Sequence, residues 1–379
     1  MANSLLVSLV SDQTIPNIQL INEMNGQVGT YLFITTQAME TKGIRQWIIN
    51  ACGIADSQLV QSIVVNQFSF DEIENQLEEF PFESYDRLIV NLTGGTKVMT
   101  LAAFDFFRDL RADIYYITGS DDTLIRLAPG RKKLTQTLKS KVTLKQYLEA
   151  YGFSVGESEA SPLPREYTMQ LFNHFLTGIF AKHKEALALF RNNRSKGIRI
   201  KEMDQVRSFL KEIGYPNQTG PLTKYEARYL SGEWFEDYVA AILADELNLG
   251  KDYIKTGINI TKQNKEGESI PNELDVAFMW KNKIYTIECK TSVFTEVFLP
   301  DGSTKPVQIL GETVYKVESL KQGFGLFANA TIMMLDDKEE NAKNLKVHYE
   351  RAILYGIRLL DRNDLVNSDT IGSLLGIHK

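Results

Sequence analysis

Asp275, Glu288 and Lys290 are the residues of this sequence whose types and spacing are best suited to chemistry. Asp275 lies in one run of β-branched and aromatic residues, and Glu288 and Lys290 lie in the next run, after a short Lys-Asn-Lys segment. Two such runs joined by a polar turn predict a β-hairpin over residues 272–290. If residues 281–282 form the loop, counting back along both strands places Asp275 directly opposite Glu288.

Alternation of side chains along the two strands separates an apolar face from a charged face. The apolar face collects Val276, Phe278, Trp280, Tyr285, Ile287 and Cys289. The other face carries Asp275, Thr286, Glu288 and Lys290. We therefore expect the first face to belong to a core and the second to end in a charge cluster.

The predicted charge cluster suits a divalent cation. Carboxylates that face each other across a sheet repel by roughly 0.2–1 kcal/mol, so the pair needs a compensating charge. Carboxylate oxygens favour Mg²⁺ or Mn²⁺, the backbone carbonyl of Cys289 offers a third ligand, and Lys290 would lie beside a metal-bound water or a scissile phosphate. Two alternatives stay open: a solvated hairpin end with mixed charges, or a two-residue shift that pairs Asp275 with Lys290.

The Asp275 and Glu288-x-Lys290 pattern resembles the PD-(D/E)xK nuclease superfamily, with Leu274 in the place of the proline. The predicted helix Gly232–Val239 resembles the Gly-x-x-x-Glu helix that these nucleases often carry before the hairpin. The resemblance implies metal-dependent phosphodiester cleavage. It implies catalytic and metal-binding roles for Asp275, Glu288, Lys290, Cys289 and Glu236. For Glu236, a solvated helical glutamate is the alternative.

The first 128 or so residues alternate short apolar runs with helical stretches. The expected strands are Leu5–Val10, Thr30–Thr35, Ser62–Val65, Arg87–Leu92, Asp113–Thr118 and Leu124–Leu127. The expected helices are Asn17–Met24, Lys42–Cys52, Asp71–Glu79 and Lys97–Leu110. This alternation predicts a largely parallel, doubly wound α/β sheet, which binds ligands beyond the carboxyl ends of its strands.

Polar residues gather at those strand ends. The candidates for ligand binding are Ser11, Gln13, Thr35, Thr36, Gly94, Gly95, Thr96 and Lys97. After the fourth strand, the two glycines let the backbone approach a ligand, while Thr96, Lys97 and a helix N-terminus offer donors to phosphate. The spacing is neither a Walker loop nor a dinucleotide fingerprint. A tight strand-to-helix turn is the alternative.

The Thr-Gly-Gly-Thr-Lys turn and the other strand ends resemble the CARF domain, the Rossmann-like sensor of CRISPR systems. That resemblance implies a homodimer that binds a cyclic oligoadenylate across its two-fold axis, with the eight residues above on the ligand. Both halves together resemble the CARF-nuclease effectors of type III CRISPR defence, the CRISPR ancillary nucleases. This implies activation by cyclic tetra-adenylate and cleavage of single-stranded RNA or DNA with Mn²⁺ or Mg²⁺.

Composition changes mark the domain boundaries. We expect a sensor domain over residues 1–135, a helical connecting region over 136–221, and a restriction-endonuclease-like PD-(D/E)xK domain over 222–379. The connecting region is predicted to contain a helix over Val142–Tyr151 with Thr143 as its cap, and one long helix over about Arg165–Asn192. A basic run follows that helix, in which the charges either contact phosphate or are solvated: Arg191, Arg194, Lys196, Arg199 and Lys201.

The composition narrows the function classes. The chain has 379 residues, of which 43% are hydrophobic and 24% charged, with a formal net charge of -6. Bulk positive charge is therefore excluded as a way to coat nucleic acid, so any nucleic-acid contact must be local. The two cysteines, Cys52 and Cys289, have no metal-binding spacing and indicate a reducing compartment. No run of about 18 apolar residues is present, and we expect a cytoplasmic protein without a membrane span.

Two other functions fit the same pattern. One is a non-catalytic CARF-type regulator whose nuclease fold has decayed, although the complete Asp-Glu-Lys set argues against decay. The other is a constitutive DNA repair or restriction nuclease whose N-terminal domain binds an ordinary nucleotide. Cleavage that a chelator stops would exclude the first, and cleavage that ignores cyclic oligoadenylate would favour the second.

Overall fold

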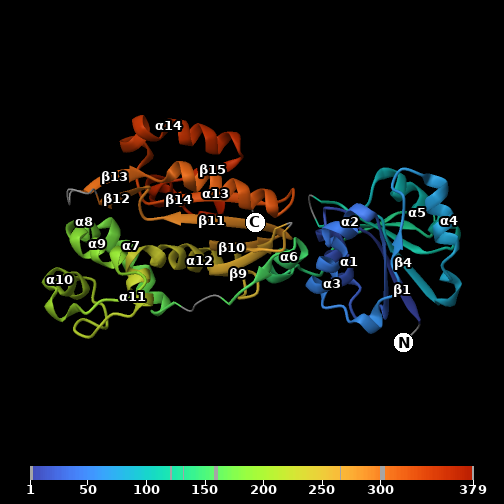
Figure 1. Ribbon diagram of the computed structural model, residues 1–379, viewed down its shortest axis with the longest axis horizontal. Coiled ribbons are helices and arrows are strands. Elements are labelled where there is room, and N and C mark those ends of the chain that lie inside the picture. The colour runs from blue at the N-terminus through green and yellow to red at the C-terminus, as the bar shows by residue number, and fades with distance from the viewer. Residues whose placement is uncertain are drawn as a thin grey trace.

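The computed structural model describes residues 3–119, 122–130, 132–157, 161–264, 266–298 and 304–377. The molecule is elongated, with an N-terminal α/β part at one end and a C-terminal α/β part towards the other (Figure 1). Helix α6 (Leu144–Ala150) lies between the two parts. No helix of the described residues is long and apolar enough to cross a membrane.

The N-terminal part is built on a seven-stranded sheet of order β3-β2-β1-β4-β5-β6-β7. Its strands are β1 (Ser4–Leu9), β2 (Thr30–Thr35), β3 (Ile63–Val64), β4 (Arg87–Asn91), β5 (Asp113–Ile117), β6 (Thr123–Ala128) and β7 (Leu134–Thr137). Pairing is parallel from β3 to β5 and antiparallel from β5 to β7. The predicted doubly wound sheet is confirmed. Strand β7 was not predicted, because its four exposed residues carry no apolar pattern.

Helices cover both faces of this sheet (Figure 1). They are α1 (Ile15–Glu23), α2 (Gln37–Lys42), α3 (Ile44–Cys52), α4 (Phe70–Glu78) and α5 (Lys97–Asp109). One core cluster joins α1 and α3 to α6, and another joins α4 and α5 to the opposite face. The single helix expected over Lys42–Cys52 is wrong at its start: Gly43, at φ 75°, ends α2 and begins α3.

The C-terminal part is built on a six-stranded mixed sheet of order β15-β14-β11-β10-β9-β8. Its strands are β8 (Ser154–Val155), β9 (Ile254–Gln263), β10 (Ser269–Trp280), β11 (Lys283–Lys290), β14 (Asn329–Met334) and β15 (Ile357–Leu360). A separate hairpin follows β11 and consists of β12 (Phe294–Phe298) and β13 (Thr304–Gln308). Strands β8 to β11 pair antiparallel, whereas β11, β14 and β15 pair parallel.

Helix α12 (Trp234–Leu247) packs on one face of the β10–β11 hairpin, where its Val239 shares a core cluster with Val276 and Ile287. Helix α13 (Leu310–Gly323) and α14 (Lys338–Leu354) pack with β14 in another cluster. The short helices α15 (Arg362–Asn367) and α16 (Ile371–Leu374) end the described chain. The apolar hairpin face predicted from the alternation is therefore a core face.

The middle of the chain is helical. Its helices after α6 are α7 (Arg165–Leu176), α8 (Ile179–Lys182), α9 (Lys184–Asn192), α10 (Asp204–Glu212) and α11 (Lys224–Arg228). The single long helix expected over Arg165–Asn192 is wrong, because Gly178 adopts φ 82° and ends α7. Thr143 caps α6 as predicted, since its Oγ1 accepts a hydrogen bond from the Gln146 amide. Residues of α7 to α10 share the core cluster of α12.

Candidate functional site

The β10–β11 hairpin has the predicted register. Lys281 and Asn282 form its two-residue loop with φ 47° and 55°, Trp280 pairs with Lys283, and the pairing runs to Val276 and Ile287. Positive φ at both loop positions is typical of the turn type that matches the twist of a hairpin. Continuing the register by one residue brings Asp275 opposite Glu288, and the two-residue shift is excluded.

Two lysines neutralise these facing carboxylates. The Lys290 Nζ lies 2.7 Å from Glu288 Oε1 and 3.4 Å from Asp275 Oδ2. Lys316, on α13, lies 2.9 and 2.8 Å from the two Glu288 oxygens. The Cys289 amide donates to Asp275 Oδ2 at 2.8 Å. Asp275 and Glu288 are only 8% and 6% exposed, so the alternative of a solvated hairpin end is wrong.

Burial and neighbouring charge move the pKa values of these groups in different directions. For Asp275, burial and then the Glu288 charge raise the pKa of the carboxyl. For Glu288, burial acts upward, but the charges of Lys290 and Lys316 outweigh it and lower the pKa. For Lys290, the two carboxylates outweigh burial and raise the pKa of the ammonium. Glu288 and Lys290 thus form an ion pair in which both groups stay charged. Asp275, beside them, accepts a proton more readily than an ordinary aspartate does.

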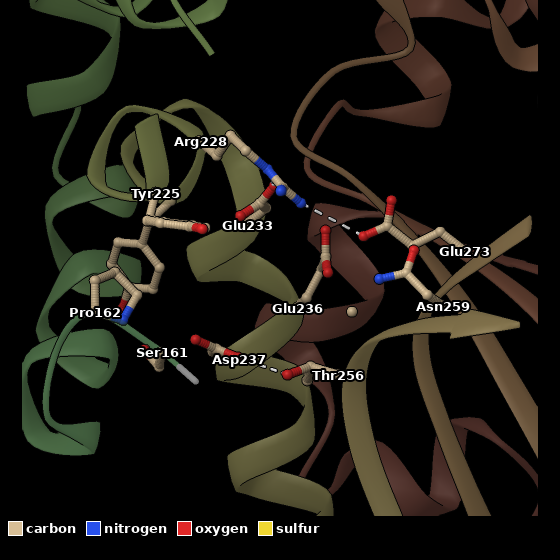
Figure 2. Close-up of a pocket in the computed structure, with 12 residues that line it drawn as sticks. Ser161, Pro162, Tyr225, Arg228, Glu233, Glu236, Asp237, Thr256, Asn259 and Glu273 are labelled. Atoms are coloured by element: carbon tan, nitrogen blue, oxygen red, sulfur yellow. Dashed lines mark hydrogen bonds and ion pairs between the residues drawn. The ribbon is translucent and has the colours of Figure 1, made fainter. Parts of the chain in front are cut away.

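Glu236 lies in the first turn of α12, close to this cluster. Burial, then the charge of Asp275 and those of Glu233 and Glu273, raise its pKa well above the ordinary value. Figure 2 shows Glu236 beside the pair formed by Arg228 and Glu273, whose closest atoms are 3.5 Å apart. The neighbouring Asp237 turns instead to Thr256, which donates to it at 2.9 Å. Glu236 is therefore a half-buried glutamate of raised pKa on the wall of this cleft.

All of the predicted catalytic and metal-binding residues line one cleft of about 340 Å³. These residues are Glu236, Asp275, Glu288, Cys289 and Lys290. The cleft also includes Lys316 of α13, to which the sequence analysis assigned no role. No local signal identifies it, because its partner Glu288 belongs to a strand before the β12–β13 hairpin.

The carboxylate and carbonyl oxygens of this cleft are the type of ligand that a hard divalent cation prefers. Two carboxylates face each other, and the Cys289 carbonyl lies 3.3 Å from the Lys290 Nζ, so it points towards the same charge cluster. Within the described ranges, however, no group of three or more His, Cys, Asp and Glu residues is arranged as a metal site. The lysine ammonium groups instead neutralise the carboxylates.

The predicted ligand residues of the N-terminal part follow strands that are neighbours in the sheet. Strands β2, β1 and β4 are parallel and adjacent, so their carboxyl ends meet at one edge. A Cβ at Gly94 would lie 2.2 Å from the Leu9 carbonyl oxygen and 3.4 Å from Ser11 Oγ, and Gly95 adopts φ 78°. The turn after β4 therefore needs glycine at both positions, and it lies against the end of β1.

Thr96 and Thr36 have structural partners at this edge, whereas the buried hydroxyl of Thr35 has no hydrogen-bond partner. Thr96 caps α5 by accepting from the Met99 amide, and its hydroxyl donates to the Gln67 carbonyl. Lys97 is the first residue of α5. Thr36 caps α2 and is 5% exposed, and Thr35 is fully buried. In this conformation the side chains of Thr35 and Thr36 pack and cap, and neither forms an exposed surface for a ligand.

Two sets of contacts join this edge to the C-terminal part. The Gln13 side-chain oxygen accepts from Tyr151 Oη at 3.3 Å and from the Leu326 amide at 3.4 Å, just before β14. At the hairpin tip, Asn282 accepts from the Val142 amide at 2.7 Å and donates to Asp122 at 2.9 Å. The strands that carry Asp275 and Glu288 therefore reach the N-terminal part at their other end.

Comparisons with known proteins match one family model to the N-terminal part of the chain and another to the C-terminal part. Residues 5–147 match the family model of the Card1 CARF domain, and residues 223–368 match that of the Card1-like endonuclease domain. No curated protein matches the chain.

Three solved structures share its fold. Protein VC1899 from Vibrio cholerae has a TM-score of 0.71 and 20% identity, with 96% of this chain and 95% of that chain covered. Can2 from Sulfobacillus thermosulfidooxidans, in complex with cyclic tetra-adenylate, has a TM-score of 0.68 and 23% identity, with 96% and 97% covered. A type III CRISPR defence DNA nuclease activated by cyclic oligoadenylate has a TM-score of 0.53 and 20% identity, with 88% and 45% covered.

Proposed function

We propose that this chain, which belongs to the proteins that join a Card1 CARF domain to a Card1-like endonuclease domain, is a cyclic-oligoadenylate-activated nuclease of type III CRISPR defence. The observation that carries the proposal is the cleft on the β10–β11 hairpin, where buried Asp275 and Glu288 face each other beside Lys290. Likeness to Can2 in complex with cyclic tetra-adenylate supports that molecule as the activator. The proposed substrate is single-stranded RNA or DNA.

We assign the cleft to the PD-(D/E)xK type and expect it to use Mn²⁺ or Mg²⁺. Asp275 and Glu288 would hold the ion with the Cys289 carbonyl, because all three are oxygen donors at one place in the cleft. When bound, the ion supplies a Lewis acid and a water of lowered pKa.

The remaining side chains act on the substrate and its protons. Lys290 stays charged, so its ammonium offsets the negative charge that develops on the phosphate oxygens. Lys316 contacts both oxygens of Glu288 and thereby fixes the orientation of that carboxylate. Glu236, whose pKa burial raises, is suited to carry a proton between water and the leaving oxygen.

The activator would bind at the carboxyl ends of β1, β2 and β4. The Gly94-Gly95 turn lets backbone amides approach phosphate, and Lys97 adds a positive charge at the start of α5. Ser11, Gln13 and Thr96 are proposed to contact the same ring, with Thr35 and Thr36 supporting the edge from within. We further propose a homodimer, in which two such edges share one cyclic molecule.

The test is cleavage of labelled single-stranded RNA, single-stranded DNA and supercoiled plasmid by the purified full chain with Mn²⁺, with and without cyclic tetra-adenylate. We expect cleavage that requires the activator and stops when a chelator is added. Cleavage without the activator would favour a constitutive repair or restriction nuclease. Activator binding with no cleavage of any substrate would favour a non-catalytic regulator.

A further inference from the structure

The basic run begins in the last turn of α9, and the fold places its members in different surroundings. Arg191 and Arg194 line the same cleft as Glu288 and Lys290. Lys196 and Lys201 are exposed and are not among the residues that line it. The helical middle of the chain, which precedes the endonuclease domain in sequence, therefore contributes two positive charges to the proposed nuclease cleft.

The segment that carries these arginines is anchored at both ends. Before it, Phe190 is fully buried in the core cluster that also contains Trp234. After it, Ile198 and Leu222 exchange two backbone hydrogen bonds of 2.9 and 2.8 Å. Gly197, at φ 78°, allows this approach, because a Cβ there would lie 2.4 Å from the Leu222 carbonyl oxygen. The arginines are thus presented to the cleft from a fixed backbone, which lowers the entropic cost of binding.

Arg194 is placed where its guanidinium can leave the carboxylate of Glu233 and bind a phosphate instead. Its Nη2 lies 3.2 Å from Glu233 Oε1, and that oxygen also accepts from Arg228 Nε at 2.6 Å. The Arg194 side chain is 51% exposed, so its ion pair with Glu233 is a weak surface interaction. A phosphate could take the guanidinium in a two-point contact while Glu233 keeps Arg228 as its partner.

We propose that Arg194, assisted by Arg191, binds the phosphodiester backbone of a single-stranded nucleic acid next to the phosphate that is cleaved. This rests on the proposed function and adds a substrate-binding role for the helical middle of the chain. A single strand fits this cleft better than a duplex. Asp275 and Glu288 are less than a tenth exposed, and the cleft is only about as large as a small-molecule pocket, so the phosphate must enter a narrow space to reach them. The phosphates of a double helix are held on a rigid, much wider cylinder.

The test compares Arg194→Ala with Lys196→Ala, which removes the same charge two residues away but outside the cleft. Cleavage of single-stranded RNA and DNA is measured at saturating cyclic tetra-adenylate over a range of salt. For Arg194→Ala we expect KM to rise about 3- to 10-fold and kcat to stay within about 2-fold. The slope of log(kcat/KM) against log[salt] should flatten by about 0.7, the value for one phosphate of a single strand. Arg194→Lys should be intermediate and Lys196→Ala unchanged.

Equal KM and salt slope for Arg194→Ala and Lys196→Ala would overturn the proposal, as would a fall in kcat alone. A second measurement separates it from the proposed function: fluorescence anisotropy of a labelled single-stranded oligonucleotide with the Glu288→Gln chain, with and without Arg194→Ala. Weaker binding on loss of Arg194 supports the proposal even if the wild-type chain does not cleave. No binding to the Glu288→Gln chain, no effect of Arg194, or equal binding of a duplex would contradict it.

Discussion

The two candidate sites of this chain differ in the groups that form them: backbone at one site and buried charged side chains at the other. At the sensor edge, the carboxyl ends of β1, β2 and β4, the site is shaped by the backbone: Gly94 lies against the Leu9 carbonyl, and Thr96 caps a helix. In the nuclease cleft, Asp275 and Glu288 are buried carboxylates that repel each other and are neutralised by two lysines. Removing one partner of a buried charge cluster leaves another charge unpaired, which is costly. We therefore expect single substitutions to abolish function in the cleft but only to shift concentration dependence at the sensor edge.

The largest effect should come from Glu288→Gln. This change removes a proposed metal ligand and leaves Lys290 and Lys316 without their common anion. We expect the cleavage rate to fall by roughly 10³-fold or more, while calorimetry shows unchanged binding of cyclic tetra-adenylate. Glu350→Gln, an exposed helical glutamate, serves as the matched control. Retained cleavage by Glu288→Gln with Mn²⁺ would remove the hairpin from the chemistry.

Lys316→Met tests whether the cleft depends on a residue far away in sequence. Lys290 would still neutralise Glu288, but the carboxylate would lose the contact that fixes both of its oxygens. We expect kcat to fall about 10- to 100-fold with little change in KM, as is found for groups that orient metal ligands. Lys316→Arg should restore part of kcat. An unchanged kcat for Lys316→Met would mean that Lys290 alone is sufficient.

Gly94→Ala tests the backbone-shaped site. The added Cβ would lie 2.2 Å from the Leu9 carbonyl oxygen, so the turn after β4 must move away from β1. We expect the activator concentration for half-maximal cleavage to rise about 10-fold or more, which corresponds to about 1.4 kcal/mol. Gly29→Ala is the control, because no atom lies within 4 Å of its Cβ position. Melting temperatures of both variants show whether the sensor domain still folds.

Lys97→Ala should have a smaller effect at the same edge. An exposed charge at a helix start contributes a modest attraction to phosphate, so we expect the half-maximal activator concentration to rise about 5-fold. The rate at saturating activator should stay the same. Lys145→Ala, on the exposed side of α6, is the control for loss of one positive charge. An identical dose response for Lys97→Ala and the wild-type chain would exclude Lys97 from the ligand site.

The pH dependence should differ between the two sites. Burial and the Glu288 charge raise the pKa of Asp275 above its ordinary value near 4. A proton therefore competes with the metal for this carboxyl at pH values above 4. The folded metal-free chain binds this proton more tightly than the unfolded chain, so Asp275 lowers stability as pH rises through that window. Stabilisation by Mn²⁺, measured by thermal unfolding, should therefore grow from about pH 5 to pH 7. Stabilisation by cyclic tetra-adenylate should change little.

Local sequence patterns determined much of this molecule. The alternating runs on either side of Lys281 and Asn282 specify which side chains share a face of the hairpin, because a one-residue slip would move the apolar side chains out of the core. A two-residue shift keeps the same faces, and only the pairing seen in the structure excludes it. The strands from β1 to β6 and the Gly-Gly-Thr turn were predicted from their apolar runs and turn chemistry in the same way. These features depend on the periodicity and conformational preferences of neighbouring residues, which are visible in the chain itself.

Only the tertiary structure decided which distant groups meet. It placed Lys316 on Glu288, Arg194 at the cleft and Leu326 on Gln13. Gly178 also divides a stretch whose helical pattern looked continuous. Such contacts arise from how helices pack against a sheet, and no periodicity within either segment encodes the partner. The sequence therefore specified the chemical groups and the hairpin that carries them, and the packing of helices around that hairpin supplied their charge partners.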